Sequence, residues 1–265
     1  MILHTMSDDE KFVNVARITP IAMDVHKRHF EEICRKFAKG NRFPYFQRVV
    51  FEDDRKNMWW LTYMVRNKSD KKKGRIWTLC YTVYEIQKKK KDGNTGKGVL
   101  MFDPLAMDKK LNGENVMGLC AVYDIIPHAF NRYTQRYLKP KGKDDIEFQR
   151  KVESMMSRFG HIDMDGDISS DKHGSHPYDM FMSCGGMLRG QVETYDMFTS
   201  YEGMLRGQFE THILIRFYTY IGEDMMFNNQ IERQDEIRKE YYQWEREGVF
   251  DVYIKNNKNK LSKYY

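Results

Sequence analysis

The sequence predicts an α+β protein in which one or more antiparallel sheets are flanked by amphipathic helices. Apolar residues recur at helical spacing between positions 19 and 40, between 126 and 160, and between 223 and 247. Other segments are rich in β-branched and aromatic residues, which favour strands. A strand-like unit is also repeated in the second half of the chain, which predicts a tandem duplicated β-hairpin there.

The first helix is expected to begin at Thr19 and Pro20. A threonine side chain can cap free amide groups at a helix start, and proline is tolerated at the first helical position. Gly40 offers a left-handed stop. The residues expected on the buried face of this helix are Ile21, Ala22, Val25, Phe30, Ile33, Cys34 and Phe37.

Strands are expected next, because five segments combine β-branched and aromatic residues with short turns. Residues 75 to 87 have apolar side chains at both alternating sets of positions, which indicates a central strand covered on both faces. Together the segments predict an antiparallel sheet of four or five strands. Their expected bounds are 45–51, 58–65, 75–87, 98–102 and 117–123.

Two helices are expected after this sheet, one from Pro127 to just before Pro140 and one from Asp144 to Gly160. At about 100° per residue, the first helix sorts its side chains onto two opposite faces. The apolar face comprises Ile126, Phe130, Tyr133 and Tyr137, and the polar face His128, Arg132, Gln135 and Arg136. The polar segment 161–177 is expected to be a loop or a domain border.

The chain then repeats itself. Residues 179–195 and 196–212 are identical at 12 of 17 positions, which indicates a tandem duplication. Each unit is interpreted as a strand, a turn at Gly185-Gly186 or at 202–203, and a second strand. Two successive hairpins or one long ribbon would both fit. A strand over 213–221 and a charged helix over 223–247 complete the prediction.

Three segments follow from this order. Residues 1–125 are expected to hold a helix and an antiparallel sheet, and residues 126–255 the later helices and the duplicated hairpins. Residues 256–265 form a basic tail whose composition favours mobility. The first two segments could be separate domains or one continuous domain.

The net charge is +6, and the lysines gather in runs such as 71–73 and 88–91. Such runs either contact phosphates or keep hairpin tips soluble. The four cysteines include no Cys-x-x-Cys pair, and no apolar run is long enough to cross a membrane. With no secretory signal at the amino terminus, we expect reduced thiols, a cytoplasmic location and no membrane partner.

No cofactor or metal is expected. Residues 161–172 resemble a calcium loop, but His161 and Lys172 occupy the first and last ligand positions, where the loop needs oxygens. His173, His176 and Cys184 lack the paired spacing of a zinc site. The motifs of phosphate loops, dinucleotide-binding folds, zinc proteases and esterases do not occur in the sequence.

The polar face of the helix at Pro127 carries the candidate catalytic residues His128, Arg132 and Arg136. The helix dipole and Arg132 both disfavour the imidazolium, so His128 is expected to be a neutral general base. The arginines could bind a scissile phosphate. Candidate acid partners are His212, Tyr195 and Tyr220, with His212 preferred, and candidate phosphate-binding residues in the repeats are Arg189 and Arg206.

A helix of the form His-Ala-x-x-Arg-x-x-x-Arg followed by an antiparallel sheet resembles the small ribonuclease toxins of the barnase/RelE-like superfamily. The matching residues are His128, Ala129, Arg132 and Arg136, with 178–221 as the sheet. The resemblance covers about a third of the chain and leaves residues 45–123 unexplained. It implies metal-independent RNA cleavage, with His128 and the two arginines at the site.

Three functions therefore stay open. The protein is expected to interact with RNA or another nucleic acid, either as a metal-independent endoribonuclease of toxin type or as a binding module without catalysis. The alternative is a structural or assembly protein, of viral origin for example, that uses the duplicated hairpins as a partner surface. In that alternative His128 lies on an ordinary exposed helix face.

Overall fold

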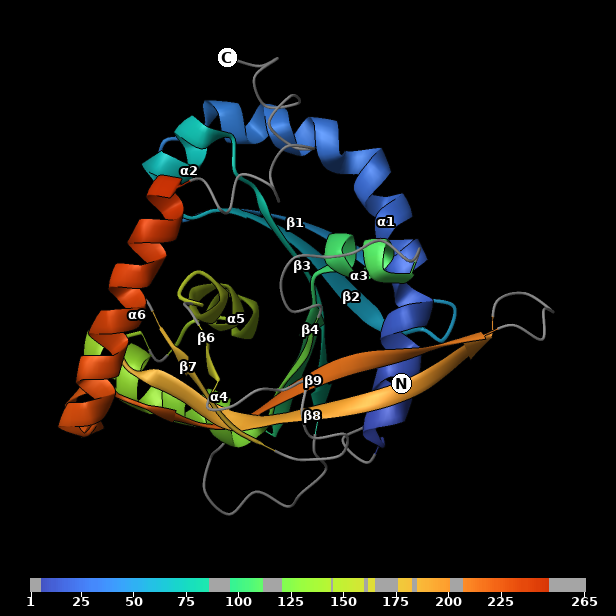
Figure 1. The fold of residues 1–265 in the computed structure, drawn as a ribbon. Coiled ribbons are helices and arrows are strands. Elements are labelled where there is room, and N and C mark those ends of the chain that lie inside the picture. Colours follow the sequence, from blue (N-terminus) through green and yellow to red (C-terminus); the bar gives the residue numbers. More distant parts are fainter. Residues whose placement is uncertain are drawn as a thin grey trace.

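The computed structural model describes residues 6–85, 96–111, 121–143, 145–159, 162–164, 176–182, 185–200 and 207–247. It confirms the α+β class, with one large sheet flanked by helices (Figure 1). Elements of the first half are α1 (Asp8–Lys39), β1 (Tyr45–Glu52), β2 (Met58–Val65), α2 (Lys68–Lys73), β3 (Trp77–Glu85), β4 (Lys97–Phe102), α3 (Pro104–Leu111) and β5 (Ala121–Ile125). Those of the second half are α4 (Pro127–Tyr133), a π-helical turn (Thr134–Leu138), a 3-10 turn (Lys139–Lys141), α5 (Phe148–Met156), β6 (Ile162–Met164), β7 (His176–Phe181), β8 (Met187–Ser200), β9 (Gly207–Ile221), a 3-10 turn (Glu223–Met225) and α6 (Asn228–Glu247).

The described strands form one nine-stranded sheet in the order β1-β2-β3-β4-β5-β9-β8-β7-β6. Every neighbouring pair is antiparallel except β5 and β9, which run parallel with Asp124 opposite Arg216. This pairing joins strands from the segments 1–125 and 126–255 into a single sheet. The first five strands follow the order that the sequence predicted.

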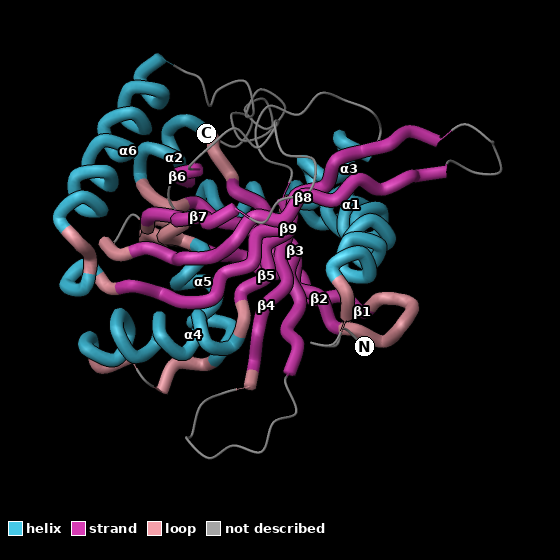
Figure 2. The backbone as a smooth tube through the Cα atoms, turned by 60° about the horizontal axis from the view of Figure 1, so that its bottom comes forward, coloured by secondary structure: helices cyan, strands magenta, loops and turns pink. Residues whose placement is uncertain are grey.

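Helices cover both faces of the sheet (Figure 2). Successive residues of a strand point to opposite faces, so Leu61 and Tyr63 of β2 pack in the core beneath α1, while Trp60 packs with the core beneath α4 and α5. Both cores are rich in fully buried aromatic and aliphatic side chains. The α4 core also receives β8 and β9 side chains, including Leu188 and Phe217. The apolar face of the helix at Pro127 therefore packs on a buried hydrophobic core.

Helix α1 begins eleven residues earlier than the expected start at Thr19. Ser7 caps it, because the Ser7 Oγ accepts from the Glu10 amide at 3.3 Å and the Glu10 carboxylate accepts from the Ser7 amide at 2.7 Å. Thr19 lies inside the helix and donates its hydroxyl to the Val15 carbonyl at 2.8 Å. Pro20 is also internal. The helix ends before Gly40, as expected, but Gly40 is extended, with φ of −74° and ψ of 135°, and not left-handed.

Other expected features also differ. The second of the two helices expected after the first sheet, α5, spans Phe148–Met156 and is shorter than the expected 144–160. The helical path from α4 continues through Pro140, because a π turn and then a 3-10 turn replace the α-helix there. A 3-10 turn tolerates this proline in its first turn. The expected loop 161–177 contains strand β6 and the start of β7. Lys71, Lys72 and Lys73 lie in the short helix α2 and not at a hairpin tip.

The first repeated unit contains a hairpin formed by β7 and β8, with Gly185 and Gly186 in its turn at φ values of 86° and 79°. A side chain is rarely tolerated at such angles. Strands β8 and β9 form a second, longer hairpin, whose connecting residues 201–206 lie outside the described part. Beyond Val192 and Ile213 these strands have no other described neighbour and project from the sheet as a ribbon (Figures 1 and 2).

A buried polar group, here called the Asp124 cluster, fastens α1 to the middle of the sheet. Asp124 of β5 is 1% exposed and accepts hydrogen bonds from Lys11 Nζ at 2.9 Å, Arg216 Nε at 3.1 Å and the Tyr84 hydroxyl at 2.6 Å. Asp8 of α1 also binds both cations. The cluster joins α1, β3, β5 and β9, and its five members are Asp8, Lys11, Tyr84, Asp124 and Arg216.

Gly98 of β4 makes room for this cluster. Tyr84 lies opposite Gly98 in the sheet, and its ring crosses β4 to reach Asp124 on β5. A Cβ atom at position 98 would lie 2.5 Å from the Tyr84 hydroxyl oxygen, where real Cβ atoms essentially never lie. The absence of a side chain at Gly98 is therefore a packing requirement of the Tyr84 hydrogen bond.

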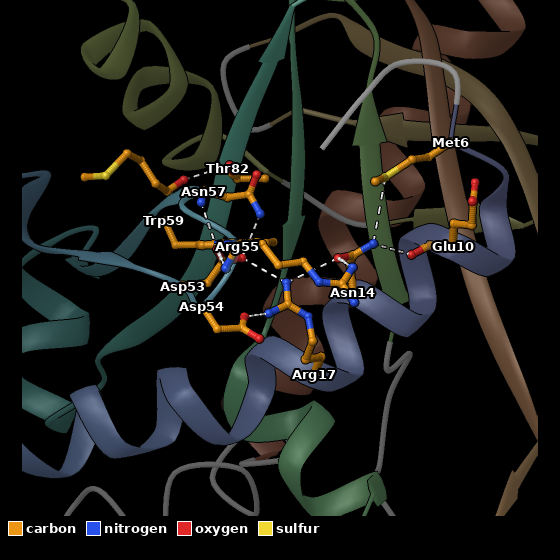
Figure 3. Close-up of polar contacts among 11 residues, drawn as sticks. Met6, Glu10, Asn14, Arg17, Asp53, Asp54, Arg55, Asn57, Trp59 and Thr82 are labelled. Atoms are coloured by element: carbon orange, nitrogen blue, oxygen red, sulfur yellow. Dashed lines mark hydrogen bonds and ion pairs between the residues drawn. The ribbon is translucent and has the colours of Figure 1, made fainter. Parts of the chain in front are cut away.

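A second buried carboxylate, Asp53, fastens the β1–β2 turn to α1 (Figure 3). It accepts from the Asn57 amide and Asn57 Nδ2, both at 2.8 Å, from Trp59 Nε1 at 3.1 Å and from Arg17 Nη2 at 2.9 Å. The Arg55 amide is a further donor at 2.9 Å. Burial alone would raise the pKa of Asp53, but these hydrogen bonds outweigh it and hold the pKa well below the ordinary aspartate range.

Candidate nucleic-acid interface

Helix α4 presents the predicted polar face to solvent because its other face is buried. Ala129, Phe130 and Tyr133 are at most 1% exposed and pack against the sheet. The Tyr133 ring meets the Tyr220 ring of β9 edge-on, with 5.3 Å between centroids. The Tyr133 hydroxyl also hydrogen-bonds Ser154 of α5 at 3.0 Å. Contacts to two other elements thus fix the orientation of the helix, as a binding face requires.

His128 lies on the exposed face, and its Nε2 accepts a hydrogen bond from Arg132 Nε at 3.4 Å. Reduced hydration of the ring lowers its pKa, and the charges of Arg132 and Arg136 lower it further. The lowered pKa favours the neutral ring, with Nε2 placed as the acceptor nitrogen. This is the protonation state of a general base.

Arg132 is the arginine that the fold places beside this histidine. Its Nη1 donates to the Gln135 Oε1 at 3.3 Å, while its Nε faces His128. These neutral acceptors fix the guanidinium without neutralising its charge. The positive charge next to a neutral imidazole suits an anionic ligand.

Arg136 is oriented differently from the prediction. The π turn over Thr134–Leu138 changes the helical repeat there, and Arg136 Nη1 donates to the Tyr220 carbonyl at 2.5 Å. Gly222 lies next to both Asp224 and Arg136. The fold thus brings His128, Arg132 and Gln135 together. Arg136 instead bonds to the end of β9, although its charge still helps to lower the pKa of His128. No pattern in the sequence predicts this long-range hydrogen bond between Arg136 and Tyr220.

The expected acid partners do not lie opposite His128 in the described part of the chain. His212 lies beside the start of β5, because Ile213 pairs with Ala121, whereas His128 follows the end of β5. Five residues of β9 separate His212 from Phe217, which is on the order of 15 Å. Tyr220 lies close to α4, but it is buried and donates its hydroxyl to the Gly185 carbonyl at 3.2 Å.

Arg189, a predicted phosphate-binding residue, belongs to a different surface. Its neighbour Leu188 packs in the core beneath α4, so Arg189 points to the opposite face of the sheet, where it is exposed. It pairs in register with Asp179 and Thr219. Arg189 cannot share one phosphate with His128. The second predicted residue, Arg206, lies outside the described residues.

Among the residues that the structure describes, no group of three or more His, Cys, Asp or Glu side chains could hold a metal ion. Most of the calcium-like segment 161–172 lies outside those residues. Cys34 and Cys80 are buried free thiols. None of the described helices has the length and apolar character needed to cross a bilayer.

Comparison of the chain with protein-family models, with curated proteins and with solved structures found no match.

Proposed function

We propose that the protein binds nucleic acid through the exposed face of α4, with Arg132 contacting a backbone phosphate. The observation that carries the proposal is the hydrogen bond between Arg132 Nε and His128 Nε2 on a helix whose other face is buried. Gln135 adds an amide beside the guanidinium. A fixed guanidinium offers paired donors that match a phosphate.

RNA cleavage by the same face is the finer proposal, and the lowered pKa of His128 favours it. In this reaction His128 Nε2 takes the proton of a ribose 2′-hydroxyl as the 2′-oxygen attacks phosphorus. The bond from phosphorus to the 5′-oxygen breaks, and a proton from solvent completes the leaving hydroxyl. A cyclic 2′,3′-phosphate remains on the other product. For His128 Nε2 to take this proton, Arg132 first turns from Nε2 to the phosphate, which frees the nitrogen lone pair.

Replacing Arg132 by glutamine is expected to weaken single-stranded RNA binding by about tenfold at low salt. The plot of log affinity against log salt should become shallower by about 0.7, because one phosphate contact is lost. Fluorescence anisotropy with a labelled oligonucleotide measures both. Arg238→Gln is the matched control, since Arg238 is an exposed arginine on α6 that pairs with nearby Asp235. Equal loss in both variants would refute the α4 site.

The cleavage proposal has its own variant, His128→Gln. It is expected to keep RNA affinity within about twofold but to abolish cleavage in the presence of a chelator, because only the proton acceptor is lost. Gel analysis of labelled RNA gives the result. Intact RNA after incubation with purified wild-type protein would reject cleavage while leaving the binding proposal standing.

The projecting ribbon of β8 and β9 supports the alternative of an assembly protein. Over Thr194–Ser200 and Gly207–His212 each strand has a free outer edge within the described sheet, and such edges can pair with another chain. This alternative predicts a concentration-dependent oligomer in light scattering, which shortening the ribbon would abolish. A monomer at all concentrations would count against assembly.

A further inference from the structure

A basic hollow lies between the end of α1 and the short helix α2, which are neighbours in the fold (Figure 1). Its volume is about 640 Å³, within the range of small-ligand sites and far larger than a single phosphate. Three lysines give it a positive lining. The lining residues, here called the α2 hollow, are Asn41, Phe43, Lys68, Lys71 and Lys72.

Lys71 forms the fixed part of the α2 hollow. Its Nζ donates to the carbonyls of Ala38 at 2.8 Å and Gly40 at 2.6 Å, and to the Asn41 Oδ1 at 3.2 Å. These bonds cap the carboxyl end of α1 and hold the following loop against α2. The hollow is therefore held in shape by a side chain that spans both of its walls.

Lys68 and Lys72 provide the accessible charge. Both are exposed, and within the described part of the chain neither has a hydrogen bond or an ion pair. The acid on the same helix, Asp70, is 3% exposed and accepts from Trp77 Nε1 at 3.1 Å. The Asp70 carboxylate also lies 3.9 Å from an Arg75 nitrogen. It is therefore not positioned to neutralise the two lysines.

Phe43 adds an aromatic surface to this charge. Its ring is partly buried against the core beneath α1 and also lines the hollow. A ring that is fixed on one side can stack on a base, while lysines track the phosphate. Arg42, between Asn41 and Phe43 in the chain, is also exposed.

We infer that the α2 hollow binds a nucleotide unit of single-stranded nucleic acid, with Lys68 and Lys72 on the phosphate and Phe43 against the base. This site is separate from the α4 face, and it does not depend on the function proposed for His128 and Arg132. A single-stranded ligand is favoured because only an unpaired base can reach an aromatic ring in a hollow.

The test uses the full chain carrying Arg132→Gln, so that the α4 face is already weakened and a further loss of binding reports the α2 hollow. One sample also carries Lys68→Gln and Lys72→Gln. Its control carries Lys27→Gln and Lys239→Gln instead, because Lys27 and Lys239 are exposed lysines as well. The probe is a labelled single-stranded oligonucleotide of about eight nucleotides. The first pair is expected to lower affinity at least about tenfold and to reduce the salt slope by about 1.4, whereas the control pair changes little.

Three further measurements decide the chemistry of the occupant. Phe43→Leu keeps an apolar side chain against the core and should lower affinity about fivefold or more through lost stacking. Adenosine monophosphate should compete better than inorganic phosphate if a base is bound. Equal loss in the two lysine pairs would overturn the inference. So would binding to anionic phosphatidylserine vesicles without binding to the oligonucleotide, because that would identify a membrane surface instead.

Discussion

Replacing Asp124 by asparagine should lower the free energy of unfolding by about 3 to 5 kcal/mol. The change keeps the shape of the side chain but removes the charge that Lys11 and Arg216 share. Lys11 is 6% exposed, so its ammonium cannot recover full hydration. The cost therefore comes from cations that lose the Asp124 charge in a buried site, where they still pair with Asp8. Chemical denaturation followed by circular dichroism measures the difference.

Two controls separate the buried cluster from ordinary ion pairs. Asp235→Asn removes an exposed partner of Arg238 on α6 and should change stability by less than about 1 kcal/mol. Tyr84→Phe removes only the hydroxyl that donates to Asp124 at 2.6 Å, and it should cost about 1.5 to 3 kcal/mol. A loss in Asp124→Asn no larger than in Asp235→Asn would show that the cluster does not hold α1 on the sheet.

The second large effect concerns Asp53 and its dependence on pH. Asp53→Asn should destabilise the protein by about 3 kcal/mol at neutral pH, because the carboxylate accepts from Arg17, Asn57 and Trp59 in a buried site. The pKa of this carboxyl is lowered in the folded state. Its stabilisation is therefore complete above the ordinary aspartate pKa and is lost as the pH falls from there toward the lowered pKa.

Denaturation of wild type and Asp53→Asn across the acidic range tests this sign. The stability difference between them should shrink as the pH falls below the ordinary aspartate pKa, since protonation removes the charge from the wild type as well. Asp54→Asn is the neighbouring control, because the Asp54 side chain is 64% exposed and should contribute less than about 1 kcal/mol. A difference that stays constant with pH would contradict the role of the Asp53 charge.

Most strands could be predicted because their signals are local. A segment rich in aromatic and other apolar residues predicted β2 at its observed bounds, and Gly40 correctly marked the end of α1. The start of α1 was also readable, because Ser7 and Glu10 form a capping box. The prediction preferred Thr19 and Pro20, a single capping side chain followed by proline, which is a weaker helix-start signal than a capping box. Proline is tolerated inside α1 since a long buried face compensates for one missing hydrogen bond.

The joining of the two halves could not be predicted from the sequence. It depends on the parallel pairing of β5 with β9, which lie about 90 residues apart, and no local pattern specifies that register. The candidate site could likewise be predicted only as far as its local sequence pattern reached. Helical spacing placed His128 beside Arg132, whereas the π turn and the bond from Arg136 to the Tyr220 carbonyl depend on how α4 packs against β9.

The most direct test of the α4 face is the pKa of the His128 imidazole, measured by NMR with and without a single-stranded RNA oligonucleotide. In the free protein the pKa should lie below that of an ordinary histidine, because reduced hydration and two nearby arginines disfavour the charged ring. A phosphate on Arg132 should raise it, since the anion offsets the arginine charge. His26, which lies on α1 and is buried against Tyr63 of β2, should not respond. An unchanged His128 pKa at saturating RNA would contradict binding at this face.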